Sequence, residues 1–548
     1  MRMDAGWVAG VAAAALVGGL TIAWGGYWES TCILAAVICT VLLIGLIARE
    51  AACRRGSRSA ACEPDLGEPP AFGEPPAHGE SPAHEESPAH EEPPALEEAP
   101  APGEPAFGEP PALEEAPTSG EPAFGEPPAS RAAVVSACVF CVILLAGLAS
   151  SVANGFTTAQ LSALSLWLLF VLTAFICILL RPDERRGATK GVAWFAAAGG
   201  VAGVMMFAGV LPFDGGVGES GRLYFCFQYA NTAGIWFLAG SLLALGSRSP
   251  ALRWAAFPQM ASLALTLSGG AGTIAVAAYL ALGIVWALRG ETPRLAALIV
   301  QGVLAVVLCA CGYGVGGVAL GGWALVACMV VGIGACAACW WLETSRVGSS
   351  AASGSSAASG SASASGSGAD SGVSAVPGSA SRGRRVAAVI CVVVCAIVLV
   401  VVVALAFPER LADASHTFSR RLVQMRDALT LISENPILGI GPDRWQYEYL
   451  AIRSGDYSVT RVHNSYLQLA LDCGLVGLAA FLCGIGILVV SALRRLARPH
   501  LDAASWNARL CVLVAALALL AHALVDFDFS FGAILVLLAL LLVPPPCV

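Results

Sequence analysis

The stretch Val386 to Phe407, VAAVICVVVCAIVLVVVVALAF, decides the fold class, because it contains no charged residue, glycine or proline. A helix of roughly 20 apolar residues crosses the hydrocarbon core of a bilayer, which is about 30 Å thick. Similar runs recur along this chain of 548 residues, of which 57% are hydrophobic and 12% are charged. By this length criterion the sequence predicts an all-α, polytopic membrane helix bundle with about fourteen transmembrane helices. Three predicted spans are short: Trp254 to Leu267, Leu510 to Val525 and Phe531 to Val543.

The distribution of arginine and lysine predicts the orientation of the bundle. Most basic residues fall on one side of the membrane if both termini are cytoplasmic, which is the side that favours positive charge. The exceptions are Arg222 and seven basic residues within 408–464. The sequence therefore predicts a multi-pass protein of the cytoplasmic (inner) membrane with one larger extracytoplasmic loop, 408–464.

Two low-complexity segments divide the chain. Residues 59–131 hold an acidic Pro/Glu-rich repeat, which predicts a disordered cytoplasmic segment because proline opposes helix and like charges repel. The repeat either binds a cytoplasmic partner or is a drifting repeat expansion. Residues 346–385 form a flexible Ser/Gly/Ala-rich cytoplasmic linker by the same logic. The remaining regions are an N-terminal transmembrane helix pair (1–58), a transmembrane bundle (132–345) and a C-terminal region (386–548).

The chemistry of the side chains argues against a metal site. Most of the 19 cysteines lie in apolar spans, where free cysteine behaves as a small hydrophobic residue, and histidine or carboxylate partners are absent nearby. Asp526 and Asp528 have the spacing of a metal-binding pair, but their position just before the last helix favours supporting or packing roles. We expect no metal, no cofactor and no nucleic-acid partner.

Downstream of Phe407 lies a polar, arginine-bearing island, Ser433 to Gly477, SENPILGIGPDRWQYEYLAIRSGDYSVTRVHNSYLQLALDCGLVG. The preceding residues, Ser419 to Ser433, predict an amphipathic helix on the membrane surface that stops at Pro436. Its apolar stripe comprises Leu422, Met425, Leu429 and Ile432. Arg421 and Arg426 flank this stripe, at the depth where a lipid-linked phosphate would lie.

These residues resemble a known family. The run RLVQMRDALTLISENPILGIGPDRW, followed by HNSYLQLALDCGLVGLAAFL, is similar to the hallmark region of the O-antigen ligase and polymerase superfamily. Two weaker similarities, GRLYFCFQYANTAG and HALVDFDF, extend the resemblance over roughly residues 130 to 545. The resemblance implies a metal-independent membrane glycosyltransferase. Such enzymes transfer a glycan from an undecaprenyl diphosphate carrier to a hydroxyl of an acceptor glycan or glycolipid at the outer face, during assembly of cell-surface polysaccharide.

The resemblance also assigns site residues. Arg222 and Arg421 match the family's arginines and would neutralise the leaving diphosphate, because guanidinium groups offer paired donors. Arg426 and Arg444 are weaker candidates for the same role. His463 would be the catalytic base that accepts the proton of the acceptor hydroxyl, and Asn231 and Asn464 would contact substrate.

Structural alternatives exist for the main candidates. An arginine in an outer loop can be a headgroup anchor, His463 can be a packing or capping residue, and Asn231 can hydrogen-bond across the bundle. One position departs from the family pattern: Ser268 is followed by Gly269, where the family commonly has arginine. Other functions also remain open: a transporter or transport-auxiliary protein for a small anion, or a non-catalytic envelope assembly protein.

Overall fold

The computed structural model describes residues 5–23, 29–61, 131–314, 320–357, 377–406, 408–499 and 501–543. The acidic repeat, from residue 62 onward, and the centre of the predicted linker, 358–376, lie outside the described residues, so the expectations for them stay predictions. The chain divides into two compact units, residues 1–50 with 128–548, and residues 51–127. The helices that position the functional site belong to the first unit.

The secondary structure of the described residues is helical, apart from turns and one isolated β-bridge between Val217 and Leu223. The α-helices are α1 (Ala5–Ile22), α2 (Glu29–Ala61), α3 (Arg131–Ala153), α4 (Thr158–Leu179), α5 (Pro182–Phe207), α6 (Ala230–Gly246), α7 (Pro250–Trp254), α8 (Phe257–Leu265), α9 (Gly269–Arg289), α10 (Thr292–Tyr313), α11 (Gly322–Ala357), α12 (Pro377–Ala406), α13 (Pro408–Glu434), α14 (Trp445–Ile452), α15 (Ser465–Leu496), α16 (Ala503–His522) and α17 (Gly532–Leu542). Short 3-10 helices are η2 (Phe225–Phe227) and η4 (Asp528–Ser530).

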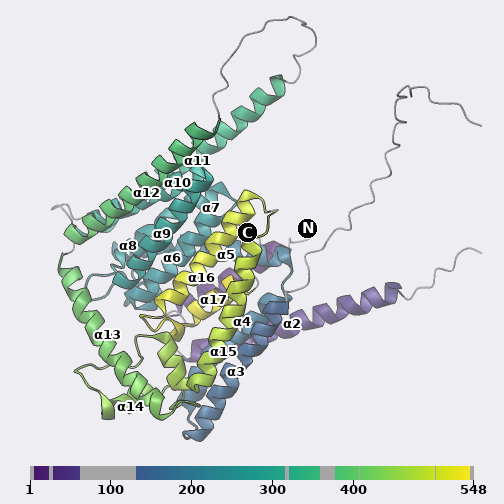
Figure 1. The fold of residues 1–548 in the computed structure, drawn as a ribbon, viewed down its shortest axis with the longest axis vertical. Helices are drawn as coiled ribbons and strands as arrows, with labels where there is room; N and C mark the ends of the chain where they lie inside the picture. The colour runs from purple at the N-terminus through teal and green to yellow at the C-terminus, as the bar shows by residue number, and fades with distance from the viewer. Residues whose placement is uncertain are drawn as a thin grey trace, which may run out of the picture. The chain divides into compact units, whose positions relative to one another are not determined.

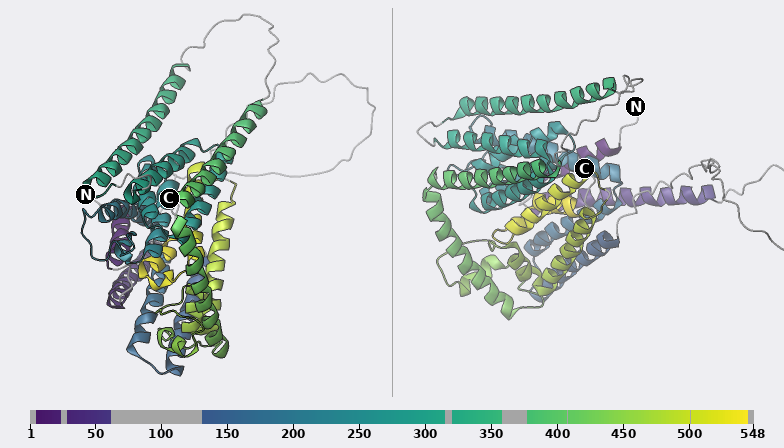
Figure 2. Two further views of the ribbon diagram at one scale, coloured as in Figure 1. Left: turned by 90° about the vertical axis from the view of Figure 1, so that its left-hand side faces the viewer. Right: turned by 45° about the horizontal axis from the view of Figure 1, so that its top comes forward.

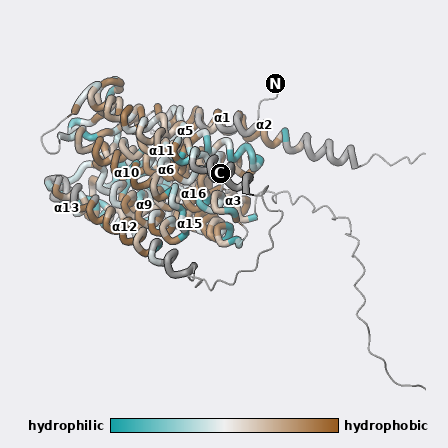
Figure 3. Tube along the Cα trace, turned by 90° about the horizontal axis from the view of Figure 1, so that it is seen from above, coloured by the Kyte–Doolittle hydropathy of each residue, from teal (hydrophilic) through white to brown (hydrophobic). Residues whose placement is uncertain are grey.

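The described helices are those of a multi-pass membrane protein. Nine of them are long and apolar enough to cross a membrane: α2, α3, α4, α5, α9, α10, α11, α15 and α16. Shorter apolar segments lie in α1, α6, α12 and α17, and hydrophobic residues predominate along the bundle (Figure 3). The all-α membrane fold is therefore confirmed, whereas the count of about fourteen spans stays a prediction.

One predicted span is shorter in the structure. Within the segment Trp254 to Leu267, α8 covers Phe257–Leu265, and Trp254 is the last residue of α7. Pro258 lies in the first turn of α8, where its missing amide hydrogen costs no helical hydrogen bond. The hydropathy of this segment is that of one span, but its proline favours a new helix start.

An aromatic cluster holds α3, α4 and α15 together. Phe140, Phe170 and Phe481, one from each helix, are fully buried. Ring centroids lie 4.8 Å apart between Phe140 and Phe170, and 5.2 Å apart between Phe481 and Phe529 of η4. Edge-to-face pairs of this kind add stability beyond the burial of their area. The cluster thus fixes η4, and with it the loop between α16 and α17, against α15.

The chain turns sharply after α12, and α13 leads from there to α14, near the first turns of α15 (Figure 1; Figure 2). The predicted end of the amphipathic helix is confirmed, because α13 ends at Glu434, just before Pro436. Its inner face buries Ala428, Leu431 and Ile432, whereas Leu422 and Leu429 are about half exposed. The exposed residues leave an apolar stripe on a helix outside the bundle core, which is the pattern of an interfacial helix.

The loop after α13 is inserted into a break in α15. The backbone N–H of Ile440 donates to Leu471 O at 2.8 Å, and the N–H of Leu475 donates to Pro436 O at 2.8 Å. The break is at Gly474, whose φ of 68° and ψ of −178° are non-helical. A Cβ at Gly474 would lie 1.9 Å from Ile437 O, and one at Gly439 would lie 2.2 Å from Leu471 O. Glycine is therefore required on both segments for this close backbone contact.

A group of charged residues lies at the C-terminal end of α6. We name it, together with Trp254, the Glu343 cluster: Arg253, Trp254, Glu291, Arg294 and Glu343. Glu343 accepts from Arg253 Nη2 at 2.7 Å and from Trp254 Nε1 at 3.0 Å. Arg294 donates to the carbonyl of Leu245 at 2.7 Å and pairs with Glu291 at 3.7 Å. These contacts connect α7, α10 and α11 to the end of α6.

Candidate functional site

Asp526, in the loop between α16 and α17, is the centre of a polar network near the first turn of α6. Its carboxylate is fully buried and accepts from Tyr229 Oη at 3.0 Å, from Asn231 Nδ2 at 2.8 Å and from Arg421 Nη2 at 3.2 Å. Arg421 also donates to the carbonyl of Val525. We refer to Arg222, Tyr229, Asn231, Arg421 and Asp526 as the Asp526 network.

Arg222 enters this network through Asn231. Its Nη2 donates to Asn231 Oδ1 at 3.1 Å, and its Nε donates to Thr266 O at 2.8 Å. The same Asn231 oxygen accepts from Ser268 Oγ at 2.9 Å. Asn231 thus bonds Arg222 on one side and Asp526 on the other, and brings the two predicted donor-binding arginines into one hydrogen-bonded group.

The carboxylate of Asp526 remains ionised in this environment. Burial alone would raise its pKa, but the opposing charge of Arg421, followed by that of His522, lowers the pKa below its ordinary value. Burial and the neighbouring Asp526 raise the pKa of Tyr229 well above its ordinary value, so its hydroxyl remains a donor. The network therefore combines two guanidinium cations with one buried anion.

The loop that carries Asp526 is fixed from several sides. Asp528 accepts from His522 Nδ1 at 2.6 Å and from Thr232 Oγ1 at 3.0 Å, and all three side chains are fully buried. Ser465 Oγ donates to the carbonyl of Asp526 at 2.8 Å. These contacts hold the loop in place, and the supporting role predicted for Asp526 and Asp528 stays a prediction.

Asn464 is the N-cap of α15. Its side-chain oxygen accepts from the backbone N–H groups of Tyr466 and Leu467, both at 3.0 Å, which satisfies donors that have no helical partner. Its Nδ2 donates to Leu524 O at 2.8 Å. Asn464 thereby orients the residue before it, His463, and a substrate contact of its own stays a prediction.

His463 lies beside the Asp526 network. Its Nδ1 is 2.8 Å from Gln424 Oε1 of α13, and its ring meets the edge of Phe527 with centroids 5.1 Å apart. Burial lowers the pKa of His463 to about 4, and the nearby Asp526 and Arg421 act on it in opposite directions. The imidazole is therefore neutral at pH 7, which is the form that can accept a proton.

The two weaker arginine candidates lie apart from this network. Arg426 is exposed on α13, next to Asp427. Arg444, before α14, pairs with Glu448 at 2.6 Å and donates to the carbonyl of Asn154. Among the described residues, no hydrogen bond or ion pair joins either arginine to Asp526, so their substrate contacts stay predictions.

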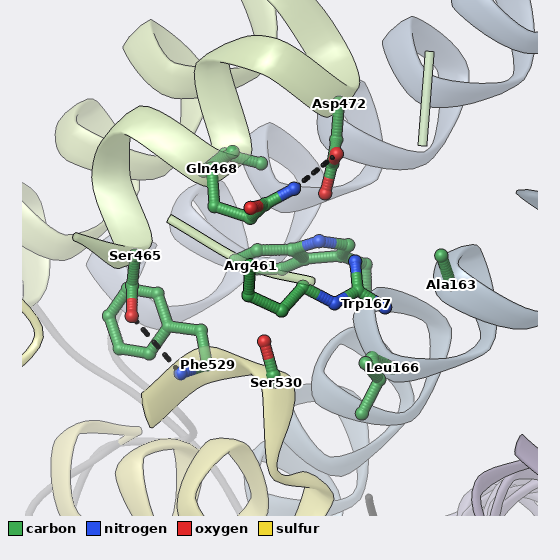
Figure 4. A pocket seen from close by; sticks show the side chains of 10 residues that line it. Ala163, Leu166, Trp167, Arg461, Ser465, Gln468, Asp472, Phe529 and Ser530 are labelled. Atoms are coloured by element: carbon green, nitrogen blue, oxygen red, sulfur yellow. Dashed lines mark hydrogen bonds between the residues drawn. The ribbon is translucent and has the colours of Figure 1, made fainter. Parts of the chain in front are cut away.

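A small pocket opens on the α4 side of α15 (Figure 4). It is lined by Trp167, Arg461, Gln468, Asp472 and Ser530, among others. Arg461 pairs with Asp443 at 2.9 Å, and Gln468 donates to Asp472 at 2.9 Å. The centre of a water molecule could occupy a volume of about 20 Å³ in this pocket. This is room for about one water and not for a sugar ring.

The structure brings together Arg222, Asn231, Arg421 and His463, which are four of the predicted site residues. Analysis of the sequence missed Tyr229 and Gln424 as partners of these residues. Tyr229 lies in the GRLYFCFQYANTAG run, two residues before Asn231, so that motif contained a signal for it. Gln424 had no such signal, because a glutamine on an amphipathic helix is most often solvated.

Comparison with known proteins adds an independent finding. Residues 321–482 match the family model for O-antigen ligase, and no curated protein sequence matches the chain. The matched segment runs from α11 into α15 and contains Arg421, His463 and the loop between them, whereas Arg222, Asn231 and Asp526 lie outside it. Over residues 321–482, the chain is therefore similar to the O-antigen ligase family.

Proposed function

We propose that this protein is a membrane glycosyltransferase that moves a glycan from an undecaprenyl diphosphate carrier to an acceptor hydroxyl. The observation that carries the proposal is the Asp526 network: Arg222 and Arg421, from distant segments, are joined through Asn231 and Asp526 beside the neutral His463. The family match supports the reaction class. The donor, the acceptor and the side of the membrane are parts of the proposal.

The two arginines would act on the leaving group. As the bond between the anomeric carbon and the phosphate oxygen breaks, negative charge grows on the lipid diphosphate and must be stabilised. Guanidinium groups held by fixed partners need little reorganisation to do this, and each offers paired donors to a phosphate. Asp526, Asn231 and Thr266 hold the arginines in place before the donor arrives.

His463 would act on the acceptor. Its ring accepts the proton of the acceptor hydroxyl while the acceptor oxygen bonds to the anomeric carbon, and the diphosphate leaves on its lipid. A pKa of about 4 makes His463 a weak base in the free protein. The negative charges of a bound diphosphate would raise that pKa toward neutrality, so the base would strengthen when the donor is present.

The exposed stripe of α13 supports a lipid-linked donor. Phe418, Leu422 and Leu429 are each about half exposed on the helix that carries Arg421. A helix with this pattern lies in the headgroup region of a bilayer. The diphosphate of a lipid carrier occupies the same depth, so the carrier could reach Arg421 while its chain remains in the membrane.

Transfer from purified undecaprenyl diphosphate-linked oligosaccharide, measured in nanodiscs, tests the proposal. We expect formation of the glycosylated acceptor in the presence of excess EDTA, since arginines would stabilise the leaving group. Activity abolished by EDTA and restored by Mg²⁺ or Mn²⁺ would overturn the metal-free mechanism. Anion uptake into proteoliposomes without glycan transfer would instead favour a transporter.

The sidedness of the reaction needs a separate test. In a cysteine-depleted background, Tyr447→Cys should be labelled by an impermeant thiol reagent from outside the cell, and Arg498→Cys only after permeabilisation. Both positions are exposed, and neither belongs to the Asp526 network. The reverse labelling pattern would contradict the predicted orientation and the outer-face reaction.

A further inference from the structure

Gln424 of α13 is the hydrogen-bond partner of His463. Its Oε1 lies 2.8 Å from His463 Nδ1, and its side chain is 4% exposed. Gln424 follows Arg421 by three residues, which places both side chains on neighbouring positions of one helix face. One helix, α13, therefore carries the candidate cation, Arg421, and also contacts the candidate base, His463, through Gln424.

The contact determines which nitrogen of His463 carries hydrogen. An amide oxygen only accepts hydrogen bonds, so Nδ1 must donate and the lone pair of the neutral ring must be on Nε2. Among the described residues, the hydrogen bond of the His463 ring is made by Nδ1, and His463 is partly buried. The proton-accepting atom is thus the nitrogen that this contact leaves open.

Other contacts already attach α13 to the structure. Asp427 accepts from Ser454 Oγ at 2.6 Å and from Tyr457 Oη at 2.5 Å, and Ala428 and Ile432 are buried beneath the helix. The Gln424 contact adds little to this attachment. Its specific consequence is the tautomer and orientation of one imidazole.

Resting on the function proposed above, we propose that Gln424 is a positioning residue that selects the Nδ1–H tautomer of His463 and presents Nε2 to the acceptor hydroxyl. The charged groups that face the ring are Asp526 from the loop before α17 and Arg421 from α13. Gln424 itself is neutral, so it orients the ring without changing its charge. A carboxylate at the same position would orient the ring and also favour its protonated form.

Two substitutions separate orientation from charge. Gln424→Met keeps a similar volume but removes the acceptor, and kcat should fall roughly 10-fold with an unchanged KM for the donor. Gln424→Glu keeps the acceptor, so kcat should remain within about threefold of wild type. The acid limb of the pH profile of kcat for Gln424→Glu should move to higher pH by at least about one unit, because the new anion stabilises the imidazolium of His463.

Gln446→Met is the matched control. Gln446 of α14 donates to Asp443 at 2.8 Å, and among the described residues it has no hydrogen bond to His463, so its substitution should leave kcat and the pH profile unchanged. Wild-type kcat in Gln424→Met, or an unmoved acid limb in Gln424→Glu, would overturn the positioning role. Recovery of activity in Gln424→Glu relative to Gln424→Met shows that the loss does not come from misfolding.

Including His463→Ala in the same assay separates this proposal from the proposed function. If His463→Ala retains wild-type turnover, the base assignment and the role of Gln424 are both wrong. If His463→Ala loses turnover while both Gln424 variants behave as wild type, only the role of Gln424 is wrong. Loss in His463→Ala and Gln424→Met, with the upward shift in Gln424→Glu, supports both.

Discussion

The Asp526 network and the Glu343 cluster lie at opposite ends of α6, and each contains an arginine paired with a carboxylate. The Glu343 cluster joins α7, α10 and α11 within residues 253–343, and Arg294 donates to the carbonyl of Leu245 at the C-terminal end of α6, where the helix dipole favours a cation. The Asp526 network joins residues from three segments that are far apart in the sequence, and it has a neutral histidine beside it. The group able to take a proton is therefore the feature that distinguishes the proposed reaction site from the Glu343 cluster.

The largest expected effect, and the most direct test of this comparison, is at His463. His463→Ala should lower the transfer rate by roughly 10² to 10⁴-fold, the usual contribution of general acid–base catalysis. Binding of the lipid-linked donor, measured separately, should persist because the arginines remain. Wild-type turnover in this variant would remove the feature that distinguishes the two clusters.

An arginine substitution in the Asp526 network should lower the transfer rate, whereas one in the Glu343 cluster should lower the melting temperature. Arg421→Ala should reduce transfer roughly 10² to 10³-fold, as expected for the loss of one preorganised donor to a developing anion. Arg421→Lys should recover only part of this, because an ammonium cannot replace a two-pronged contact.

Arg253→Ala is the control at the Glu343 cluster. It leaves Glu343 without its arginine, so the melting temperature should fall while the transfer rate of the folded protein stays within about twofold of wild type. Transfer rates and melting curves, measured on the same detergent preparations, separate an effect on catalysis from an effect on stability. Equal loss of transfer in Arg421→Ala and Arg253→Ala would show that both clusters are structural.

The pH dependence should separate the free protein from its donor complex. A base with a pKa of about 4 is charged only below that pH, so kcat/KM should remain at about 90% of its plateau at pH 5 and fall as the pH drops through 4. An enzyme whose catalytic histidine had an unperturbed pKa would have lost most of its activity by pH 5. The acid limb of kcat, which reports the bound complex, should lie at higher pH because of the diphosphate charges. Coincident limbs would mean that no anion binds near His463.

The smallest expected effect is at Gly269, the position where the family commonly has arginine. A Cβ there would meet no heavy atom within 4 Å, and the neighbouring Ser268 bonds Asn231 of the network. Gly269→Arg should therefore fold normally and lower the donor KM roughly threefold to tenfold by adding a charged hydrogen bond.

Gly270→Arg is the matched control for this variant. A Cβ at Gly270 would lie 3.0 Å from His522 Nε2, so this variant should be less stable and should not improve KM. An unchanged or higher KM in Gly269→Arg would mean that the donor does not reach the first turn of α9.

Local sequence signals predicted the parts of the structure that depend on neighbouring residues. Apolar runs predicted the helices, and Pro436 predicted the end of α13. The partners of the site residues depend on contacts between segments that are far apart, such as Tyr229 with Asp526 and Gln424 with His463. No periodicity encodes such pairs. The number of spans was uncertain for a related reason, since α8 and α17 are too short for hydropathy alone to decide whether they cross.

The interlocked glycines, Gly439 and Gly474, have a consequence for biogenesis. The loop with Gly439 is synthesised before α15, yet the N–H of Ile440 finds its acceptor only on Leu471. At a synthesis rate of about 5 to 20 residues per second, the loop waits on the order of seconds for that partner. During this interval it must be held by the insertion machinery or by water at the membrane surface. Only when the broken helix enters the bilayer can the loop bind it, so the site between α13 and α15 is assembled in the last steps of translation.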